Sequence, residues 1–428
     1  MKRTYSTELQ KHLGKTIMME GRAYNIRKLG GITFVILQDQ YGLTQCVGEH
    51  LDVLPKTGSV IQLTGEVKAE PRAPHGVEVK IAALDVLNEP TEELPFDMSK
   101  NDLNLQLTTL LDYRPLTIRH EKVKAIFAIY DTVIQSYAEA LKKLGFQEIK
   151  TPKILGAATE GGSNFFKVKY FEQEAFLAQS PQFYKQMCAG AFERVFEIGP
   201  VFRAEKHFTT RHVNEYISLD AEMAYIKNFS DIQKVLTKVM AHIFAQIAKH
   251  NQNELAAYGA TVPAVPKKIP SLKLADAKRT IKEKYGYEVP VDTDIDPEGE
   301  RLVGRYAAEE LGSDFVFLTH YPTDERPFYT MPNKKDPSVT EGFDLIFRGI
   351  EIATGGQRIH KYEQLISSLK KHGFNPESFD FYLQAFKYAM PPHGGWGMGS
   401  ERIVYKLLGL ETVKEAILFP RDVKRLVP

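Results

Sequence analysis

The apolar pattern of this chain changes its period near residue 119, and that change limits the folds open to it. Residues 15–87 contain five short runs of alternating apolar and polar side chains, interrupted by Gly-Gly, Tyr-Gly and the turn sequence PRAPHG. Such alternation predicts β-strands, and five strands in so short a stretch favour a small closed barrel of the OB-fold type. Any other small β-domain is the alternative.

From residue 119 onward, apolar side chains recur at helical spacing, and a long helix is expected to end at Gly145. The remaining apolar strands and helices follow one another irregularly, which predicts an α+β domain on a mixed, mostly antiparallel sheet flanked by helices. The polar, proline-containing residues 91–118 predict a hinge or linker. We therefore expect an N-terminal domain at 1–90 and a second domain at 119–428.

Composition excludes several classes of protein. The 428 residues include 55 basic and 54 acidic side chains, so a globally basic nucleic-acid-binding protein is ruled out, although local basic faces are not. Only two cysteines occur, which excludes a disulfide framework and suits a reducing, cytoplasmic location. No signal-peptide core and no run of 18 apolar residues is found, so no membrane segment is expected.

The sequence GGWGMGSER at residues 394–402 is the strongest local motif. Glycines at every second position of a strand would let a flat ligand lie against bare backbone. Glu401 and Arg402 then open an apolar helix, where an arginine can stack on a base or reach a phosphate. The spacing is not that of a dinucleotide fingerprint. A glycine-rich structural turn is the alternative.

Residues 201–225 predict a hairpin with an arginine at its base and a cationic tip. Arg203 precedes Glu205 by two positions, which places both on one face of a strand. An arginine fork suits a phosphate, and the carboxylate can hold it in place. The alternative is a surface hairpin with ordinary salt bridges.

Two carboxylates, Asp344 and Glu351, lie seven positions apart in the segment 342–360, and Arg358 follows a Gly-Gly pair. Carboxylates beside a polyphosphate suggest Mg²⁺, which takes one or two of them and keeps several waters. Taken alone, they could equally be solvated strand residues.

Together these three segments resemble the class II aminoacyl-tRNA synthetases. FRAE with the following RH is similar to the family's motif 2, GMGSER is similar to motif 3, and Pro152 stands at the motif 1 proline of the dimer interface. No HIGH-type sequence of class I is present. The closest resemblance, over essentially the whole chain, is to archaeal-type aspartyl-tRNA synthetases, carried by TPKILGAATEGGSNFF, QSPQFYKQ, ERPFY, IEIATGGQRIH and ILFPRD.

The resemblance implies an ATP-dependent, Mg²⁺-requiring enzyme that converts L-aspartate to aspartyl-adenylate and transfers it to the 3′ end of tRNA(Asp), with tRNA(Asn) as a second candidate. It also implies a homodimer. Asparaginyl-tRNA synthetase and a tRNA-binding paralogue without charging activity remain as alternatives; such a paralogue would be expected to lose Arg203, Glu351 or Arg402, and all three are present.

By the same resemblance, Arg203, Glu205 and Arg402 are the expected catalytic residues, with Arg203 at the α-phosphate and Arg402 with Tyr216 around the adenine. The expected ATP-binding residues are Arg203, Glu205, Arg211, His212, Val213, Tyr216, Glu351, Gly399, Ser400, Glu401 and Arg402. The expected magnesium ligands are Asp344, Glu351 and Thr354; Thr354 stands where the family often has serine.

The expected aspartate-binding residues are Glu160, Gln182, Lys185, Arg203, Asp220, Thr354 and Arg358. Lys185 and Arg358 would give two fixed cations for the side-chain carboxylate, and asparaginyl enzymes typically carry an acidic residue at the position of Lys185. A neutral amide is expected to leave both cations poorly paired, which favours aspartate.

The barrel is expected to read the anticodon by stacking and by base-edge hydrogen bonds. Phe34 and Gln45 match family positions at the central anticodon base, and Glu78 matches a further base contact; Phe34 as ordinary barrel core is the alternative. Tyr24 and Pro74 lie near the position of the third base. The non-discriminating archaeal pattern has Trp and Lys there, so a preference for tRNA(Asp) is expected.

Overall fold

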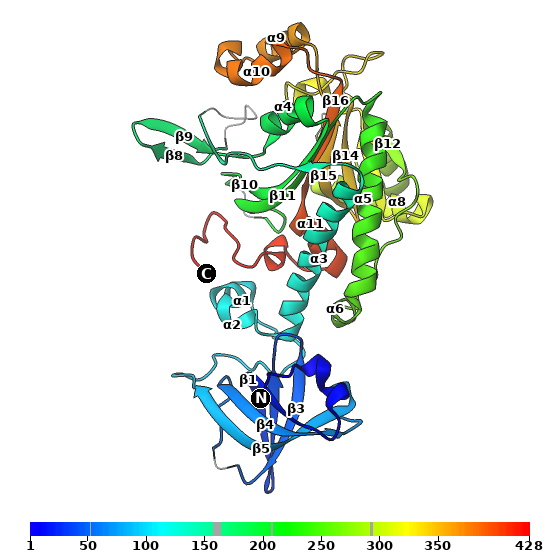
Figure 1. Ribbon diagram of the computed structural model, residues 1–428. Coiled ribbons are helices and arrows are strands. Elements are labelled where there is room, and N and C mark those ends of the chain that lie inside the picture. Colours follow the sequence, from blue (N-terminus) through cyan, green and yellow to red (C-terminus); the bar gives the residue numbers. More distant parts are fainter. Residues whose placement is uncertain (52, 157–163, 207–208, 292–293) are drawn as a thin grey trace. The chain divides into compact units, whose positions relative to one another are not determined.

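The computed structural model describes residues 1–428 apart from 52, 157–163, 207–208 and 292–293 (Figure 1). Its contacts divide the chain into two units, Met1–Leu110 with Arg119–Lys122, and Leu111–Ile118 with Val123–Pro428. The stretch expected to be a hinge contains two short helices, α1 (Leu107–Asp112) and α2 (Arg114–Thr117).

The first unit is built on a closed barrel of five strands in the order β1-β2-β3-β5-β4, as the alternating pattern predicted. Strand β3 pairs with β5 in parallel, and the other neighbouring pairs are antiparallel. The elements of this unit are η1 (Ser6–His12), β1 (Thr16–Leu29), β2 (Ile32–Gln38), β3 (Leu43–Glu49), β4 (Val60–Ala69), η2 (Pro74–Gly76) and β5 (Val77–Asn88).

Alternation along β2 decides which of its side chains fill the barrel. Val35 and Leu37 are fully buried members of the core, whereas Phe34 lies on the opposite face and is only partly buried. The alternative that Phe34 is barrel core is therefore wrong.

The second unit is built on an eight-stranded sheet in the order β12-β13-β14-β15-β16-β11-β10-β6. Only its two end pairs, β12 with β13 and β10 with β6, are parallel among the described strands, so the predicted mixed, mostly antiparallel sheet is confirmed. The strands are β6 (Gln147–Glu148), β10 (Arg194–Phe202), β11 (Glu215–Ala224), β12 (Ser271–Lys273), β13 (Phe315–Thr319), β14 (Gly342–Phe347), β15 (Ile350–Gln357) and β16 (His393–Gly399). A smaller sheet holds β7 (Ile154–Leu155), β9 (Gln173–Leu177) and β8 (Lys167–Tyr170).

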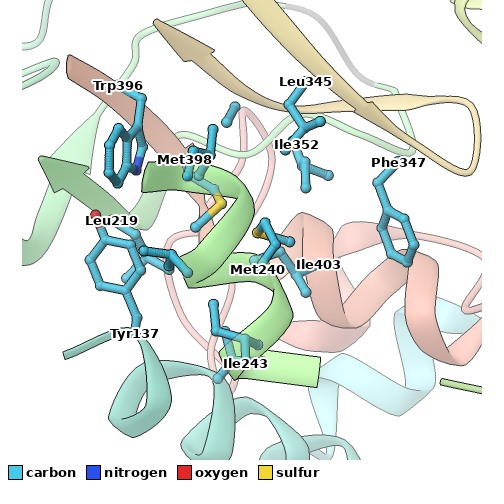
Figure 2. Close-up of a cluster of buried hydrophobic side chains, with 14 of the residues drawn as sticks. Tyr137, Leu219, Met240, Ile243, Leu345, Phe347, Ile352, Trp396, Met398 and Ile403 are labelled. Carbon is cyan, nitrogen blue, oxygen red and sulfur yellow. The ribbon is translucent and has the colours of Figure 1, made fainter. Parts of the chain in front are cut away.

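Helices α3 (Glu121–Lys143) and α5 (Phe229–His250) supply much of the core that covers one face of the large sheet. Figure 2 shows Tyr137 of α3 and Met240 and Ile243 of α5 among the strand residues Leu219, Leu345, Ile352, Trp396 and Met398. Because alternate strand residues point to opposite faces, this core leaves their neighbours free to line a site on the other side.

The remaining helices cover other parts of this unit. Helices α7 (Leu274–Tyr285) and α8 (Pro297–Leu311) pack on the residues of β13 that face away from α5, such as Val316 and Leu318. A third apolar cluster joins α4 (Gln182–Phe192), α9 (Tyr362–Lys371) and α10 (Asp380–Lys387). The other helices are α6 (Gln252–Ala257) and α11 (Ser400–Leu408). Among the described residues, no helix is long and apolar enough to cross a membrane.

Candidate active site

A deep cleft lies within the second unit, on the sheet face opposite α3 and α5. Its space, including open solvent, is about 1200 Å³. Along β11 the side chains of Tyr216, Ser218 and Asp220 line this cleft, while Leu219 and Ala221, at alternate positions of the same strand, join the core. The period of two along one strand therefore separates site residues from core residues.

The glycines of β16 have two different uses. A Cβ atom at Gly395 would lie 1.9 Å from the carbonyl oxygen of Ala221, so this glycine is required by the close packing of β16 on β11. Gly397 and Gly399 line the cleft, and a Cβ atom there would meet no atom closer than 3.3 Å. The open backbone expected for a flat ligand thus lies at these two positions.

Arg203 and Glu205 stand at the base of the β10–β11 hairpin. Strand β10 ends at Phe202, so the expectation that both residues lie on one strand is wrong, although the main chain of Arg203 still bonds to Asn214 across the hairpin. The guanidinium of Arg203 lies 3.7 Å from the Glu205 carboxylate and 5.8 Å from the Tyr216 ring centre. His212 approaches the same carboxylate at 3.7 Å.

Arg402 enters the cleft from the first turn of α11, as the sequence predicted. Its Nη1 donates to the carbonyl oxygen of Glu351 at 2.7 Å and lies 3.6 Å from the Glu351 carboxylate. Glu401 is buried beneath it and accepts from the backbone N–H of Ile217 and from Tyr130. Burial raises the pKa of Glu401, and the hydrogen bonds fix the start of α11 against β11.

Glu300 of α8 is a buried neighbour of the site that the sequence analysis did not identify. Its carboxylate pairs with Arg211, one of the expected phosphate-binding residues, and accepts from the backbone N–H of Glu351. Burial, together with the nearby Glu351 carboxylate and partly offset by Arg211, raises the pKa of Glu300 to about 7. Helix α8 follows an aspartate cap and an N-terminal proline, a start signal that could have located the helix but not its partners.

A buried network of charges forms the other end of the cleft. Lys185 of α4 donates to Asp220 at 2.7 Å and to the carbonyl oxygen of Trp396 at 2.9 Å. Arg358 donates to Glu222 at 3.1 Å and to the carbonyl oxygen of Gly395. Burial alone would lower the pKa of Arg358, but Glu222, together with Tyr329 and Tyr382, more than offsets this effect, and the pKa is raised.

These pairs change the expected basis of amino-acid selection. The two cations were expected to await a substrate carboxylate, whereas each already has a buried carboxylate partner, Asp220 for Lys185 and Glu222 for Arg358. An uncharged amide would therefore not leave either cation unpaired, and that part of the argument for aspartate is wrong.

Of the three expected magnesium ligands, Glu351 and Thr354 line the cleft and Asp344 does not. Each oxygen of Asp344 accepts a hydrogen bond, one from Thr354 at 2.5 Å and the other from Arg326 at 2.6 Å, and Asp344 does not line the cleft. Glu351 does line it, with its side chain 34% exposed. Mg²⁺ prefers oxygen ligands and keeps several waters, so the exposed carboxylate of Glu351 suits the ion, whereas both oxygens of Asp344 already accept hydrogen bonds.

Most of the other predicted residues come together in this cleft. Its lining includes Gln182, Lys185, Arg203, Glu205, Arg211, His212, Val213, Tyr216, Asp220, Glu351, Thr354, Arg358, Gly399, Glu401 and Arg402. Ser400 does not line it, and its hydroxyl donates to the carbonyl oxygen of Ile217 instead. Glu160 lies outside the described residues. Arg326 lines the cleft but was not predicted as a site residue.

The expected anticodon residues lie in the first unit. Gln45 pairs with Glu78 across β3 and β5, and their side chains are hydrogen-bonded at 2.9 Å. Phe34 lies on β2, next to β3. Pro74 is exposed in η2. Tyr24, by contrast, is buried and donates to the carbonyl oxygen of Met98, so its hydroxyl is already engaged.

Comparison with known proteins agrees with this geometry. Residues 106–423 match the family of class II tRNA synthetases (D, K and N), and residues 17–87 match the OB-fold nucleic acid binding domain. An aspartate–tRNA(Asp/Asn) ligase of Deinococcus radiodurans is 45% identical, over 100% of this chain and 99% of that protein. An aspartate–tRNA(Asp) ligase of Pyrococcus horikoshii is 42% identical over 99% of each chain.

Solved structures show the same likeness. The asparaginyl-tRNA synthetase of Pyrococcus horikoshii in complex with asparaginyl-adenylate superposes with a TM-score of 0.93 at 29% identity, covering 100% of both chains. The aspartyl-tRNA synthetase of Entamoeba histolytica gives a TM-score of 0.86 at 28% identity, over 100% of this chain and 93% of that one.

A mostly antiparallel sheet that carries a hairpin with an arginine at its base, and a glycine-rich strand that leads into a second arginine, agrees with the class II synthetase family that the chain matches. The chain belongs to the class II aminoacyl-tRNA synthetases, in the branch for aspartate, lysine and asparagine. It is an aminoacyl-tRNA ligase with an OB-fold nucleic-acid-binding domain at its N-terminal side.

Proposed function

We propose that this enzyme activates L-aspartate with ATP and transfers it to the 3′ end of tRNA(Asp). The full-length relatives at 42–45% identity are aspartate–tRNA ligases, and this supports the assignment. The observation that carries the choice of amino acid is Lys185 at the buried end of the cleft, where it and Arg358 both approach the Glu222 carboxylate.

The N–H donors of Lys185 and Arg358 distinguish a substrate carboxylate from a substrate amide. Lys185 donates two of its three N–H groups to Asp220 and Trp396, and its Nζ also lies 3.8 Å from the Glu222 carboxylate. Nη1 of Arg358 takes no part in that residue's bonds to Glu222 and Gly395. Two donors suit the two acceptor oxygens of an aspartate side chain. An asparagine side chain would turn its NH₂ group toward one of them, and a site built for an acceptor rejects a donor strongly.

The reaction needs no side-chain nucleophile, because the attacking α-carboxylate is already ionised. Arg203 neutralises the charge that grows at the α-phosphate, and Arg402 with Tyr216 holds the adenine. Arg211 and His212 hold the outer phosphates, and Glu205 orients Arg203 across the 3.7 Å between them. Correct positioning of the two substrates accounts for much of the remaining rate.

Gln182 and Asp220 would complete the aspartate site, with Asp220 near the substrate's ammonium group, and Thr354 would add a hydroxyl. Glu351 would hold Mg²⁺, which when bound neutralises phosphate oxygens. We propose that the active form is a homodimer, with Pro152 at the interface, and that the enzyme acts in the cytoplasm.

The outer face of the barrel suits a splayed anticodon. Phe34→Ala should raise the KM for tRNA about ten- to a hundredfold, because stacking on one base contributes about 1–3 kcal/mol. ATP–pyrophosphate exchange should stay unchanged, since Phe34 belongs to the barrel and is not one of its core residues. The matched control is Phe34→Tyr, which keeps an aromatic face. An unchanged KM for tRNA in Phe34→Ala would exclude stacking at this position.

Pro74 bears on the choice between the aspartate and asparagine tRNAs. A proline removes a backbone donor and stiffens the turn, whereas a lysine could contact either third base. We expect tRNA(Asp) to be charged about ten- to a hundredfold better than tRNA(Asn), the range of one base-edge contact. Pro74→Lys should narrow this ratio. Charging both transcripts side by side tests it, and equal charging by the unmodified enzyme would contradict the expectation.

A further inference from the structure

Arg326 lines the cleft and contacts an aromatic ring, a hydroxyl group and a carboxylate. It follows the short turn η3 (Thr323–Glu325), and its guanidinium lies 3.7 Å from the ring centre of Tyr321. Nη2 donates to Asp344 at 2.6 Å, and Nη1 donates to the hydroxyl of Thr354 at 3.0 Å. That hydroxyl in turn donates to the second oxygen of Asp344.

The three side chains form a closed network. The one hydroxyl proton of Thr354 is used on Asp344, and its oxygen accepts from Arg326. Because the guanidinium is planar and is held from one side by the Tyr321 ring, it matches this fork of acceptors better than a mobile cation could. Burial alone would lower the pKa of Arg326, but Asp344, together with Tyr321 and Glu351, more than offsets this effect, and the pKa is raised.

We propose that Arg326 is the permanent ion-pair partner of Asp344. Of the two carboxylates that were predicted to bind Mg²⁺, Asp344 and Glu351, only Glu351 is then available to a divalent ion. The inference rests on the proposed function for the role of the cleft, and it adds a positioning residue to that site. Glu351 itself lies 3.6 Å from Arg402, so its charge is partly neutralised as well.

The arrangement has a consequence for metal affinity. A divalent ion reaching the free enzyme meets the Arg326–Asp344 pair, which carries no net charge, and one carboxylate, Glu351, whose charge Arg402 partly neutralises. It is therefore expected to bind firmly only together with the phosphates of ATP, which supply the missing negative charge. Removing Arg326 would release the Asp344 carboxylate and create a second ligand.

The test is a titration of the full chain with Mn²⁺, without nucleotide, in which electron paramagnetic resonance measures the free ion. Arg326→Gln should bind Mn²⁺ at least about tenfold more tightly than the unmodified protein, because ligand charge sets the affinity of such sites. Arg326→Gln with Asp344→Asn should return to the unmodified value. Arg305→Gln, which removes an exposed arginine of α8, is the matched control and should change nothing.

An Arg326→Gln protein that binds Mn²⁺ no better, or whose gain survives Asp344→Asn, would overturn the proposal. Circular dichroism checks that the variants are folded. Should Arg326→Gln fail to fold, Asp344→Asn alone decides the matter: unchanged Mn²⁺ binding supports the proposal, and a loss equal to that of Glu351→Gln refutes it. These measurements involve neither aspartate nor tRNA, so aspartate-dependent pyrophosphate exchange tests the proposed function separately.

Discussion

Arg203→Ala is expected to lose adenylate formation by a factor on the order of a hundred to a thousand, while the protein stays folded. A preorganised donor aimed at charge that develops in the transition state contributes roughly 3–4 kcal/mol. The side chain of Arg203 is 40% exposed, and it contacts, among others, Glu205 and the Tyr216 ring in the cleft. Its removal therefore leaves no cavity in the core.

ATP–pyrophosphate exchange with aspartate measures this loss directly. Arg305→Ala is a suitable control, because it removes an exposed arginine of the same unit that pairs only with Glu309 along its own helix among the ion pairs of the described residues. Exchange by Arg203→Ala within about tenfold of the unmodified enzyme would mean that the hairpin does not hold the α-phosphate.

Lys185→Met is expected to impair the use of aspartate strongly and also to destabilise the protein. Lys185 is 1% exposed and holds Asp220, itself 2% exposed, at 2.7 Å. Removing one partner of a buried ion pair leaves the other charge uncompensated, which costs about 3–5 kcal/mol. Loss of a donor for the substrate carboxylate should lower kcat/KM for aspartate on the order of a hundredfold or more.

A second substitution separates these two effects. Lys185→Met with Asp220→Asn removes the orphaned charge, so most of the free energy of unfolding should return while aspartate activation stays lost. Lys234→Met is the control for removing an exposed lysine, and it should cost less than about 1 kcal/mol. If Lys185→Met keeps the preference for aspartate over asparagine, another residue selects the amino acid.

The alternation of residues 15–87 and the mixed pattern beyond residue 119 were enough to predict the barrel and the mostly antiparallel sheet. Periodicity works because one strand or helix needs only its own sequence to present an apolar face. The motifs around Arg203 and Arg402 were readable for a similar reason, since each occupies one short segment that ends a strand or opens a helix. The apolar run FDLIFRGIEIA reads as a single strand in the sequence, whereas the structure divides it between β14 and β15 with a turn at Arg348 and Gly349.

The partners of the charged residues could not be predicted in this way. Lys185 and Asp220 are 35 positions apart, Arg211 and Glu300 are 89 apart, and Glu222 and Arg358 are 136 apart. The last pair exists because the order of strands brings β11 beside β16, and β16 beside β15. In the other two pairs one partner comes from a helix, Lys185 from α4 and Glu300 from α8. The sequence also suggested two unpaired cations for the substrate, because a pattern of single residues carries no information about which opposite charge lies next to each.

The sequence by itself therefore determined the two folded units, the faces of their strands and the arginines and glycines that define a class II synthetase. The tertiary structure decided how these groups are neutralised: Lys185 by Asp220, Arg358 by Glu222 and Asp344 by Arg326. The physical reason is the sequence separation over which each property is set. Backbone periodicity and helix starts are local properties of the chain, whereas burying a charge requires a partner, and the partner is supplied by whichever strand or helix the topology places within a few ångströms.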